Sequence, residues 1–159
     1  MWYASTNNTY IQDGQAFELD GISYPPQWIA QATPEQKTAI GLEEVVATNS
    51  PKSDQYYWVS TELNGASLTY VNTPKDSDII KELILSTIKQ QAYSLLQPTD
   101  YVELRNIKDN TYKPEWILWR DSIRQQASNA ISLCESLNSV QDLENVLPIN
   151  WNPDPNSEA

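Results

Sequence analysis

The spacing of apolar residues changes once along the chain, near Thr73-Pro74, and this change constrains the fold more than any other feature. Before it, aromatic and β-branched residues come in short alternating runs, which are typical of half-buried strands. After it, apolar residues recur every three or four positions, which is typical of amphipathic helices. We therefore predict an α+β chain, in which a small antiparallel β-rich N-terminal half is packed with or followed by a helical C-terminal half of two long helices and several short ones.

Two β-hairpins are expected in the first half. The first spans residues 17–24 and turns at Asp20-Gly21, a dipeptide that supports the positive φ of a tight turn. The second spans residues 55–71, is rich in aromatic and β-branched residues, and turns at Asn64-Gly65. These two hairpins are the main basis for the β-rich prediction.

A strand and a short helix are expected between the hairpins. Residues 42–47 read as one further strand. Thr33 and Gln36 have the spacing of a capping box, and Pro34 suits the first helical position, so a helix is expected over 34–40.

The second half contains two long amphipathic helices. We expect the apolar stripe of the first helix to be buried; it consists of Ile80, Leu83, Ile84, Ile88, Ala92, Leu95 and Leu96. Pro98 ends this helix and Pro114 begins the second. The stripe of the second helix consists of Trp116, Arg120, Ile123, Ala127, Ile131 and Cys134.

Short helices complete the second half. One is expected over 100–106, with Asp100 and Glu103 at the spacing of a capping box, and another follows Ser139. We divide the chain into a β-rich lobe over 1–72, a helical lobe over 73–147 and an acidic tail rich in proline and asparagine over 148–159. Trp151 is the one residue of the tail expected to anchor it.

The charge of the chain argues against several classes of partner. There are 10 lysines and arginines against 21 aspartates and glutamates, and the formal net charge is −11. Nucleic-acid backbones and anionic membrane surfaces are bound by clustered cations, so we expect neither as a direct partner. No apolar stretch approaches the roughly 18 residues of a membrane span, and the N-terminus lacks the basic and apolar regions of a secretory signal.

Several kinds of catalytic chemistry lack the residues they need. The chain has no histidine, one cysteine, and four glycines that match no nucleotide-binding motif. The acid pairs Asp76/Asp78 and Asp142/Glu144 stand where acids favour a helix N-terminus, and their spacing is not that of a calcium loop. Cys134 lies on an apolar stripe and reads as a structural thiol. We therefore predict no catalytic residue, metal ligand or cofactor, and we place an enzyme last among the alternatives.

Arginine and tryptophan residues are the remaining candidates for function. Trp116, Trp119, Arg120 and Arg124 fall on successive turns of the second long helix, and Arg105 precedes it. In a structural interpretation, Trp116 and Arg120 cover the first long helix and the arginines pair with nearby acids. In a functional interpretation, these residues form a protein-binding surface, since both types are enriched at interface hot spots.

The aromatic strand Tyr56-Tyr57-Trp58 allows two interpretations as well. Alternate residues of a strand face opposite sides of the sheet. Either Tyr57 or the pair Tyr56 and Trp58 is therefore expected in the core, with the other exposed or covered by a partner.

Short motifs then suggest a family. Its pattern is Leu…Thr-Asp-Trp…Arg, then a Pro-x-x-Trp helix with a repeated Tyr-Arg…Arg pattern, then Trp-Pro near the end. The segments that carry the resemblance here are 21–29 (Gly-Ile-Ser-Tyr-Pro-Pro-Gln-Trp-Ile), Thr33-Pro34-Glu35, Ile40-Gly41, Leu96…Thr99-Asp100-Tyr101…Arg105, Pro114-Glu115-Trp116, Trp119-Arg120…Arg124 and Trp151-Asn152-Pro153. Tyr101 stands where the family has Trp, and Asn152 separates Trp151 from its proline. From about Phe17 to Pro153, the chain resembles small proteins encoded beside tail-fibre genes in tailed bacteriophages.

The resemblance implies a non-enzymatic function. Proteins of this family are similar to tail-fibre assembly chaperones, which bind the distal part of a fibre and aid its folding or trimerisation. By resemblance, we expect this chain to bind a phage tail-fibre or baseplate protein in the host cytoplasm during assembly. The partner-binding residues expected are Trp58, Tyr101, Arg105, Trp116, Trp119, Arg120, Arg124 and Trp151.

Two alternative functions remain open. The first is a virion structural protein that acts as a tail or baseplate adaptor and holds a fibre permanently. The second is a small inhibitor that binds basic host proteins by acidic mimicry. A second copy of the chain is a further candidate partner.

Overall fold

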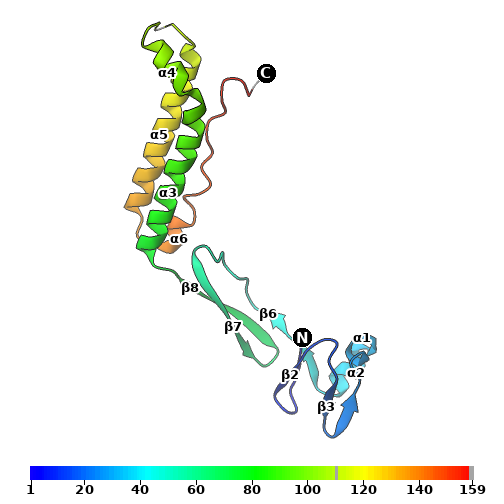
Figure 1. Cartoon of the computed structure of the whole chain (residues 1–159). Helices are drawn as coiled ribbons and strands as arrows, with labels where there is room; N and C mark the ends of the chain where they lie inside the picture. Colours follow the sequence, from blue (N-terminus) through cyan, green and yellow to red (C-terminus); the bar gives the residue numbers. More distant parts are fainter. Residues whose placement is uncertain (110, 158–159) are drawn as a thin grey trace. The chain divides into compact units, whose positions relative to one another are not determined.

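A computed structural model describes residues 1–109 and 111–157 of the chain (Figure 1). It divides into two compact units, Met1–Thr73 and Pro74–Ala159. The α+β class is confirmed, because small sheets fill the first unit and long helices fill the second.

A three-stranded antiparallel sheet contains the N-terminus. Its order is β2-β1-β5, with β1 over Trp2–Ala4, β2 over Thr9–Ile11 and β5 over Leu42–Glu44. The prediction of a single strand over 42–47 is wrong. It is interrupted at Val45, and the following β6 (Val46–Ala47) pairs with β8 in a different sheet.

The first predicted hairpin is confirmed, and it supports an aromatic cluster. Strands β3 (Phe17–Leu19) and β4 (Ile22–Tyr24) are antiparallel, with Phe17 opposite Tyr24. Those two rings are stacked with centroids 4.8 Å apart, and the Trp28 ring lies 4.9 Å from that of Tyr24. Trp28 begins the short helix α1 (Trp28–Gln31). The buried core beneath consists of Ala4, Ile11, Leu19, Ile29 and Leu42.

The predicted helix start at Thr33 is confirmed. Helix α2 spans Pro34–Ala39 and begins with a complete capping box. The Gln36 N–H donates to Thr33 Oγ1 over 3.3 Å, and the Thr33 N–H donates to Gln36 Oε1 over 2.8 Å.

The second predicted hairpin is also confirmed, but its turn lies one residue later than expected. Strands β7 (Tyr57–Asn64) and β8 (Ser67–Pro74) leave Gly65 and Ala66 as the loop, and Gly65 has φ +57°. The sheet order is β6-β8-β7. Tyr57 and its neighbour Tyr56 are both buried, whereas Trp58 is 67% exposed.

The second unit is built on two helices that pack side by side, α3 (Ser77–Leu96) and α5 (Pro114–Ser136) (Figure 1). Between them lie the 3-10 turn η1 (Gln97–Thr99) and helix α4 (Asp100–Asn106), and helix α6 (Val140–Leu143) follows α5. As expected, Ser139 caps α6 by accepting from the Asp142 N–H. None of the helices in the described ranges has the length and apolar character that a membrane span requires.

The buried face of α3 is narrower than predicted. Its buried residues are Ile80, Ile84, Ile88 and Ala92, which form a single row spaced by four. The prediction that Leu83 is buried is wrong, since it is 46% exposed. A helix that packs against one main neighbour buries a narrow seam, and Leu83 lies beside that seam.

The end of the chain is held more extensively than expected. The C-terminal segment over residues 148–157 runs along the helices in Figure 1. Trp119 Nε1 donates to the Asn152 carbonyl over 3.0 Å, and Trp151 Nε1 donates to Gln91 Oε1 over 3.1 Å. Gln126 bonds the backbone of residues 150 and 152 through its amide nitrogen and oxygen. The segment is therefore held on the helices in two ways: its backbone bonds the side chains of Trp119 and Gln126, and its own Trp151 side chain bonds Gln91.

Candidate protein-binding surface

Arg120 occupies a buried position where η1 and α4 meet α5. Its side chain is 2% exposed. Its guanidinium donates to the Leu96 carbonyl and to Thr99 Oγ1, and it pairs with Asp100 at 2.7 Å and with Glu103 at 3.0 Å. One buried nitrogen, Arg120 Nε, has no hydrogen-bond partner within the described residues. Arg120 thus fixes the position of α4 on α5.

One prediction at this junction needs correction. Asp100 and Glu103 do not form the capping box expected at the start of α4. The N-cap of α4 is Thr99, its side chain makes no capping bond, and both acids bind Arg120 instead. The buried guanidinium is a stronger partner for a carboxylate than a single backbone N–H, since both groups are charged.

Arg124 extends the same ionic network to the surface. It is 43% exposed, contacts Glu103, and pairs with Asp121 at 3.0 Å. The hydrogen bond from Arg120, and after it the bond from Arg124, lowers the pKa of Glu103 from its usual value. The hydrogen bond from Glu103 raises the pKa of Arg124.

The packing around Arg120 favours the structural interpretation of the tryptophans and Arg120. Trp116 and Trp119 are each 8% exposed and pack edge to face, with ring centroids 5.6 Å apart. They belong to a core with Ala92, Val102 and Ile123. Three of the residues expected to bind a partner thus lie inside the unit.

The other expected residues lie at the surface or close to it. Tyr101 is 45% exposed and Trp58 is 67% exposed, while Trp151 is partly buried on the helices. Arg105 is exposed, and its guanidinium lies 5.4 Å from the centroid of the Tyr112 ring. Trp58 belongs to the first unit and the other expected residues to the second.

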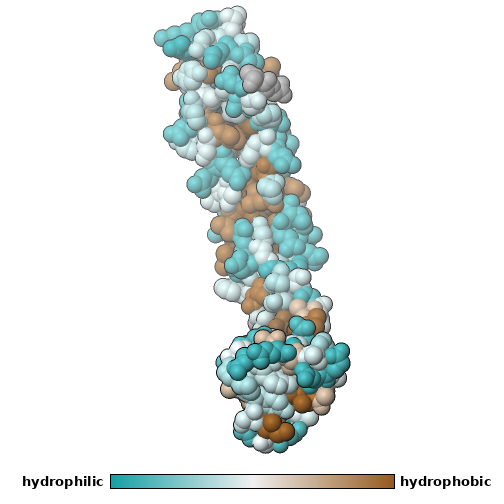
Figure 2. All heavy atoms as spheres, turned by 90° about the vertical axis from the view of Figure 1, so that its right-hand side faces the viewer, coloured by the Kyte–Doolittle hydropathy of each residue, from teal (hydrophilic) through white to brown (hydrophobic). Residues whose placement is uncertain are grey.

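Apolar side chains that the sequence analysis did not single out are exposed beside Tyr101. Leu104 is 67% exposed and Ile107 is 81% exposed, so Tyr101, Leu104 and Ile107 recur every three residues along and just beyond α4. We call these three residues the α4 surface. Hydrophobic patches also interrupt the hydrophilic surface of the helical unit on the face shown in Figure 2. Val102 of α4 is fully buried, so the helical geometry directs Tyr101, Leu104 and Ile107 outward; the sequence alone does not show which face of α4 is buried.

A shallow hollow adjoins the α4 surface. It is lined by Glu103, Asn106 and Ile107 with Ile117 of α5. Beyond it, Lys113 holds its ammonium 5.6 Å from the Trp116 ring centroid. The end of the helical unit therefore combines apolar side chains with a few cations held over aromatic rings, a composition typical of protein-binding surfaces.

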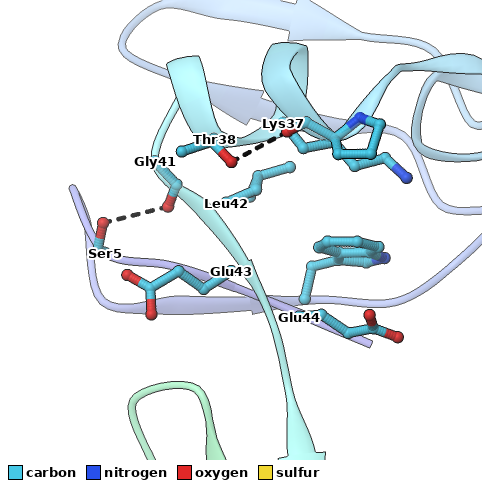
Figure 3. Close-up of a pocket in the computed structure, with 9 residues that line it drawn as sticks. Ser5, Lys37, Thr38, Gly41, Leu42, Glu43 and Glu44 are labelled. Atoms are coloured by element: carbon cyan, nitrogen blue, oxygen red, sulfur yellow. Dashed lines mark hydrogen bonds between the residues drawn. The ribbon is translucent and has the colours of Figure 1, made fainter.

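The first unit has a hollow of its own between α2 and β5 (Figure 3). Lys37 Nζ lies 4.4 Å from the centroid of the Trp2 ring, and Glu43 and Glu44 of β5 also line the hollow. The Ser5 hydroxyl donates to the Gly41 carbonyl over 3.1 Å, and the Thr38 hydroxyl donates to the Pro34 carbonyl. The hydroxyl groups thus support the local backbone, and the charged groups are what this hollow offers to a ligand.

Two further observations concern reactive groups. Cys134 is a free and fully buried thiol, and burial raises its pKa. Within residues 1–109 and 111–157, no three carboxylate or thiol side chains gather as a metal site would require.

Comparison of the chain with models of protein families, with curated proteins and with solved structures finds no match. Its function is therefore inferred from its own residues and from the resemblance of its motifs.

Proposed function

We propose that the chain is a non-enzymatic bacteriophage protein that binds a tail-fibre polypeptide and assists its folding or assembly in the host cytoplasm. The sequence resemblance suggests the class of partner. The single structural observation that supports a binding role is the α4 surface, where Tyr101, Leu104 and Ile107 are 45%, 67% and 81% exposed. Grouped apolar side chains on the surface of a folded chain mark a binding site more often than isolated ones do.

The motif residues that the family shares have a physical role in this proposal. Arg120 and Thr99 are buried, and the Arg120 guanidinium bonds both Thr99 and the carboxylate of Asp100. They are positioning residues, because their bonds fix α4 against α5 and so hold the α4 surface in place. The partner is then contacted by the exposed residues of α4.

The physical properties of the chain suit a chaperone. An unassembled fibre exposes strand edges and apolar surface, and both promote aggregation. A partner that covers such surface with apolar side chains, and that carries a net charge of −11, keeps the complex dispersed by repulsion.

The test is co-expression of this chain with the fibre protein encoded beside it. In the double variant Leu104→Gln/Ile107→Gln, we expect the Kd for the fibre to rise about tenfold, a loss of roughly 1.4 kcal/mol of binding, and the yield of soluble fibre trimer to fall. The matched control is Leu133→Gln, which makes the same change at a leucine of α5 that is 52% exposed. Circular dichroism should show an unchanged helix content in both variants.

Equal fibre yields from the double variant and the control would contradict the role of the α4 surface. If the wild-type chain neither binds the fibre nor raises its yield, the proposal as a whole fails. Mass spectrometry of purified virions separates the two modes of action: absence from the particle fits a chaperone, and a fixed ratio to the fibre fits an adaptor retained in the tail.

A further inference from the structure

The long hairpin of the first unit leaves one strand uncovered. Among the described residues, its sheet has the order β6-β8-β7, so β7 is an edge strand. Tyr57 is buried, and every later residue of this eight-residue strand is exposed. The unpaired backbone groups of a long exposed edge form a template for another strand.

Strand β7 lacks the features that usually prevent such pairing. It contains no proline and no lysine, and Glu62 is its only charged residue. Val59 and Leu63 are 37% and 41% exposed. The edge is therefore suited to pairing rather than protected from it.

Hydrogen bonds on the other side of the sheet show which β8 backbone groups are used there. The carbonyls of Ala66 and Leu68 accept from the N–H groups of Val46 and Thr48, and the backbone of Tyr70 bonds the Asn49 side chain. Even-numbered residues of β8 thus direct their backbone groups away from β7. Since this direction alternates along a strand, the odd-numbered residues of β8 bond β7.

The same alternation shows which residues of β7 direct their backbone groups to its open edge. A two-residue loop at Gly65 and Ala66 places Asn64 opposite Ser67, so the even-numbered residues of β7 bond β8. The odd-numbered residues Val59, Thr61 and Leu63 then direct their N–H and C=O groups to the open edge. Their side chains share one face of the sheet.

We propose that β7 pairs with β7 of a second copy of this chain, in antiparallel orientation, about a two-fold axis at Thr61. The two three-stranded sheets then form one continuous sheet of six strands. Val59 of each copy lies opposite Leu63 of the other, and Glu62 lies opposite Ser60. All three outward-directed residues form hydrogen bonds across the axis.

The side chains of β7 favour this register over its neighbours. An axis at Glu62 places two carboxylates opposite each other, which is destabilising. An axis at Ser60 places Glu62 opposite Trp58 and Val59 opposite Thr61. The axis at Thr61 gives two Val59–Leu63 pairs and separates the carboxylates, so the strand is complementary to itself.

This self-complementarity is what identifies a second copy as the occupant. A two-fold pairing uses both open edges at once and closes the assembly at a dimer. The inference uses no residue of the α4 surface, so it does not depend on the proposed function.

A pair of lysine variants tests the interface by sedimentation velocity across a range of concentrations. We expect wild type to show a concentration-dependent dimer. Thr61→Lys places two ammonium groups opposite each other at the axis and should raise the dimer Kd about tenfold or more, which corresponds to roughly 1.4 kcal/mol. Ser60→Lys adds the same charge but places it opposite Glu62 of the other copy, so its dimer should be at least as stable as that of wild type.

Cysteine cross-linking tests the register. Thr61→Cys brings the two thiols together at the axis and should give a disulfide-linked dimer under mild oxidation. Leu63→Cys is the matched control, since its two copies are separated by four residue positions along the strands and should not cross-link. The native Cys134 is buried and should not react in either variant.

A wild-type chain that stays monomeric at all concentrations overturns the proposal. So does a dimer that Thr61→Lys leaves intact, or efficient cross-linking through position 63 instead of 61. If wild type is monomeric and Thr61→Lys abolishes fibre binding, the edge serves a strand of the fibre, and a second copy is the wrong occupant.

Discussion

The two units bury their cores in different ways. In the second unit, four residues of α3 at intervals of four, from Ile80 to Ala92, make one continuous row against α5. In the first unit, five buried side chains come from separate short elements: Ala4, Ile11, Leu19, Ile29 and Leu42. The first core therefore depends on turns that bring short strands together, and the second depends on the regularity of a helix.

The units also differ in how they use cations. Arg120 of the second unit is 2% exposed and is held by two carboxylates, one hydroxyl and one carbonyl. Lys37 of the first unit lies over the Trp2 ring beside a surface hollow. Removing a charge partner should therefore affect the second unit much more than the first, because the energy of an ion pair grows with burial.

The largest expected effect comes from the buried row of α3. Ile84→Ala removes a fully buried side chain and should lower the free energy of unfolding of the second unit by about 2–5 kcal/mol. Leu83→Ala is the adjacent control at a 46% exposed position and should cost well under about 1 kcal/mol. Hydrogen exchange with mass spectrometry reports each unit separately in a urea series.

This pair of variants also tests whether the two units have independent cores. If Ile84→Ala accelerates exchange in residues 1–73 as much as in the helices, the two units unfold together and their cores are not independent. If Ile84→Ala and Leu83→Ala lowered the free energy of unfolding equally, the buried row would not be what stabilises α3.

The next largest effect is expected at Arg120. Arg120→Ala removes the buried guanidinium that donates to the Leu96 carbonyl and to Thr99 Oγ1, and it should cost about 3 kcal/mol. This is the lower end of the range for broken buried pairs, because Asp100 and Glu103 are 59% and 36% exposed and can be hydrated. Arg124→Ala removes two surface ion pairs, with Asp121 and with Glu103, and should cost about 0–1 kcal/mol.

Urea unfolding followed by circular dichroism at 222 nm checks both arginine variants. Arg120→Ala should also expose the amides of α4 to exchange, since Arg120 holds that helix. A cost as small as that of Arg124→Ala would place Arg120 among ordinary surface charges and would remove the reason for calling it a positioning residue.

Local patterns predicted the parts of this fold that depend on neighbouring residues. The capping box at Thr33, the helix over 100–106 and the hairpin over 17–24 were all readable, because each is set by residues within a few positions. The strands β1 and β2 were not predicted. Each has only three residues, too few to show an alternation, and β1 is completed by β5 some forty residues later.

The candidate site shows the same limit. The helical spacing placed Arg120 on a buried stripe, but the groups that bind it lie 17–24 residues earlier and leave no signal in local spacing. Tyr101 was singled out and is exposed, whereas Leu104 and Ile107 were missed. Burial of α4 depends on which face Arg120 draws toward α5, and that is a tertiary property.

A smaller effect is expected at the capping box of the first unit. Thr33→Ala removes the acceptor for the Gln36 N–H and should lower the stability of α2 by about 1 kcal/mol. Thr38→Ala makes the same chemical change near the end of the same helix, where the hydroxyl only donates to the Pro34 carbonyl. It should be neutral or slightly stabilising, since alanine favours helices.

Exchange of the α2 amides is the measurement for both threonine variants. Faster exchange in Thr33→Ala alone would confirm that this unit depends on local turn and cap residues. Identical rates in the two variants would show that tertiary contacts of α2 with β5, and not the cap, hold the helix.

The smallest expected effect is the acid dependence of the Arg120 network. Hydrogen bonds from Arg120 and Arg124 hold the pKa of Glu103 below its value in the unfolded chain, near 4.5. The unfolded chain therefore binds the proton first, and the stabilisation by Glu103 is present above pH 4.5 and is lost as pH falls through the folded-state pKa. Its size should be about 0.5 kcal/mol, because solvent screens a carboxylate that is 36% exposed.

Glu103→Gln isolates this acid-dependent term. The variant should be slightly less stable than wild type at neutral pH and equal to it at low pH, so the difference between their unfolding free energies should shrink as pH falls. Asp13→Asn is the counterpart in the first unit, where the hydrogen bond from the N-terminal amine lowers the pKa of Asp13. If each variant changes the acid response of its own unit alone, the two networks are independent. A Glu103→Gln difference that is constant with pH would mean that Glu103 acts through packing, and that the ionic contrast between the units rests on Asp100 and Arg120.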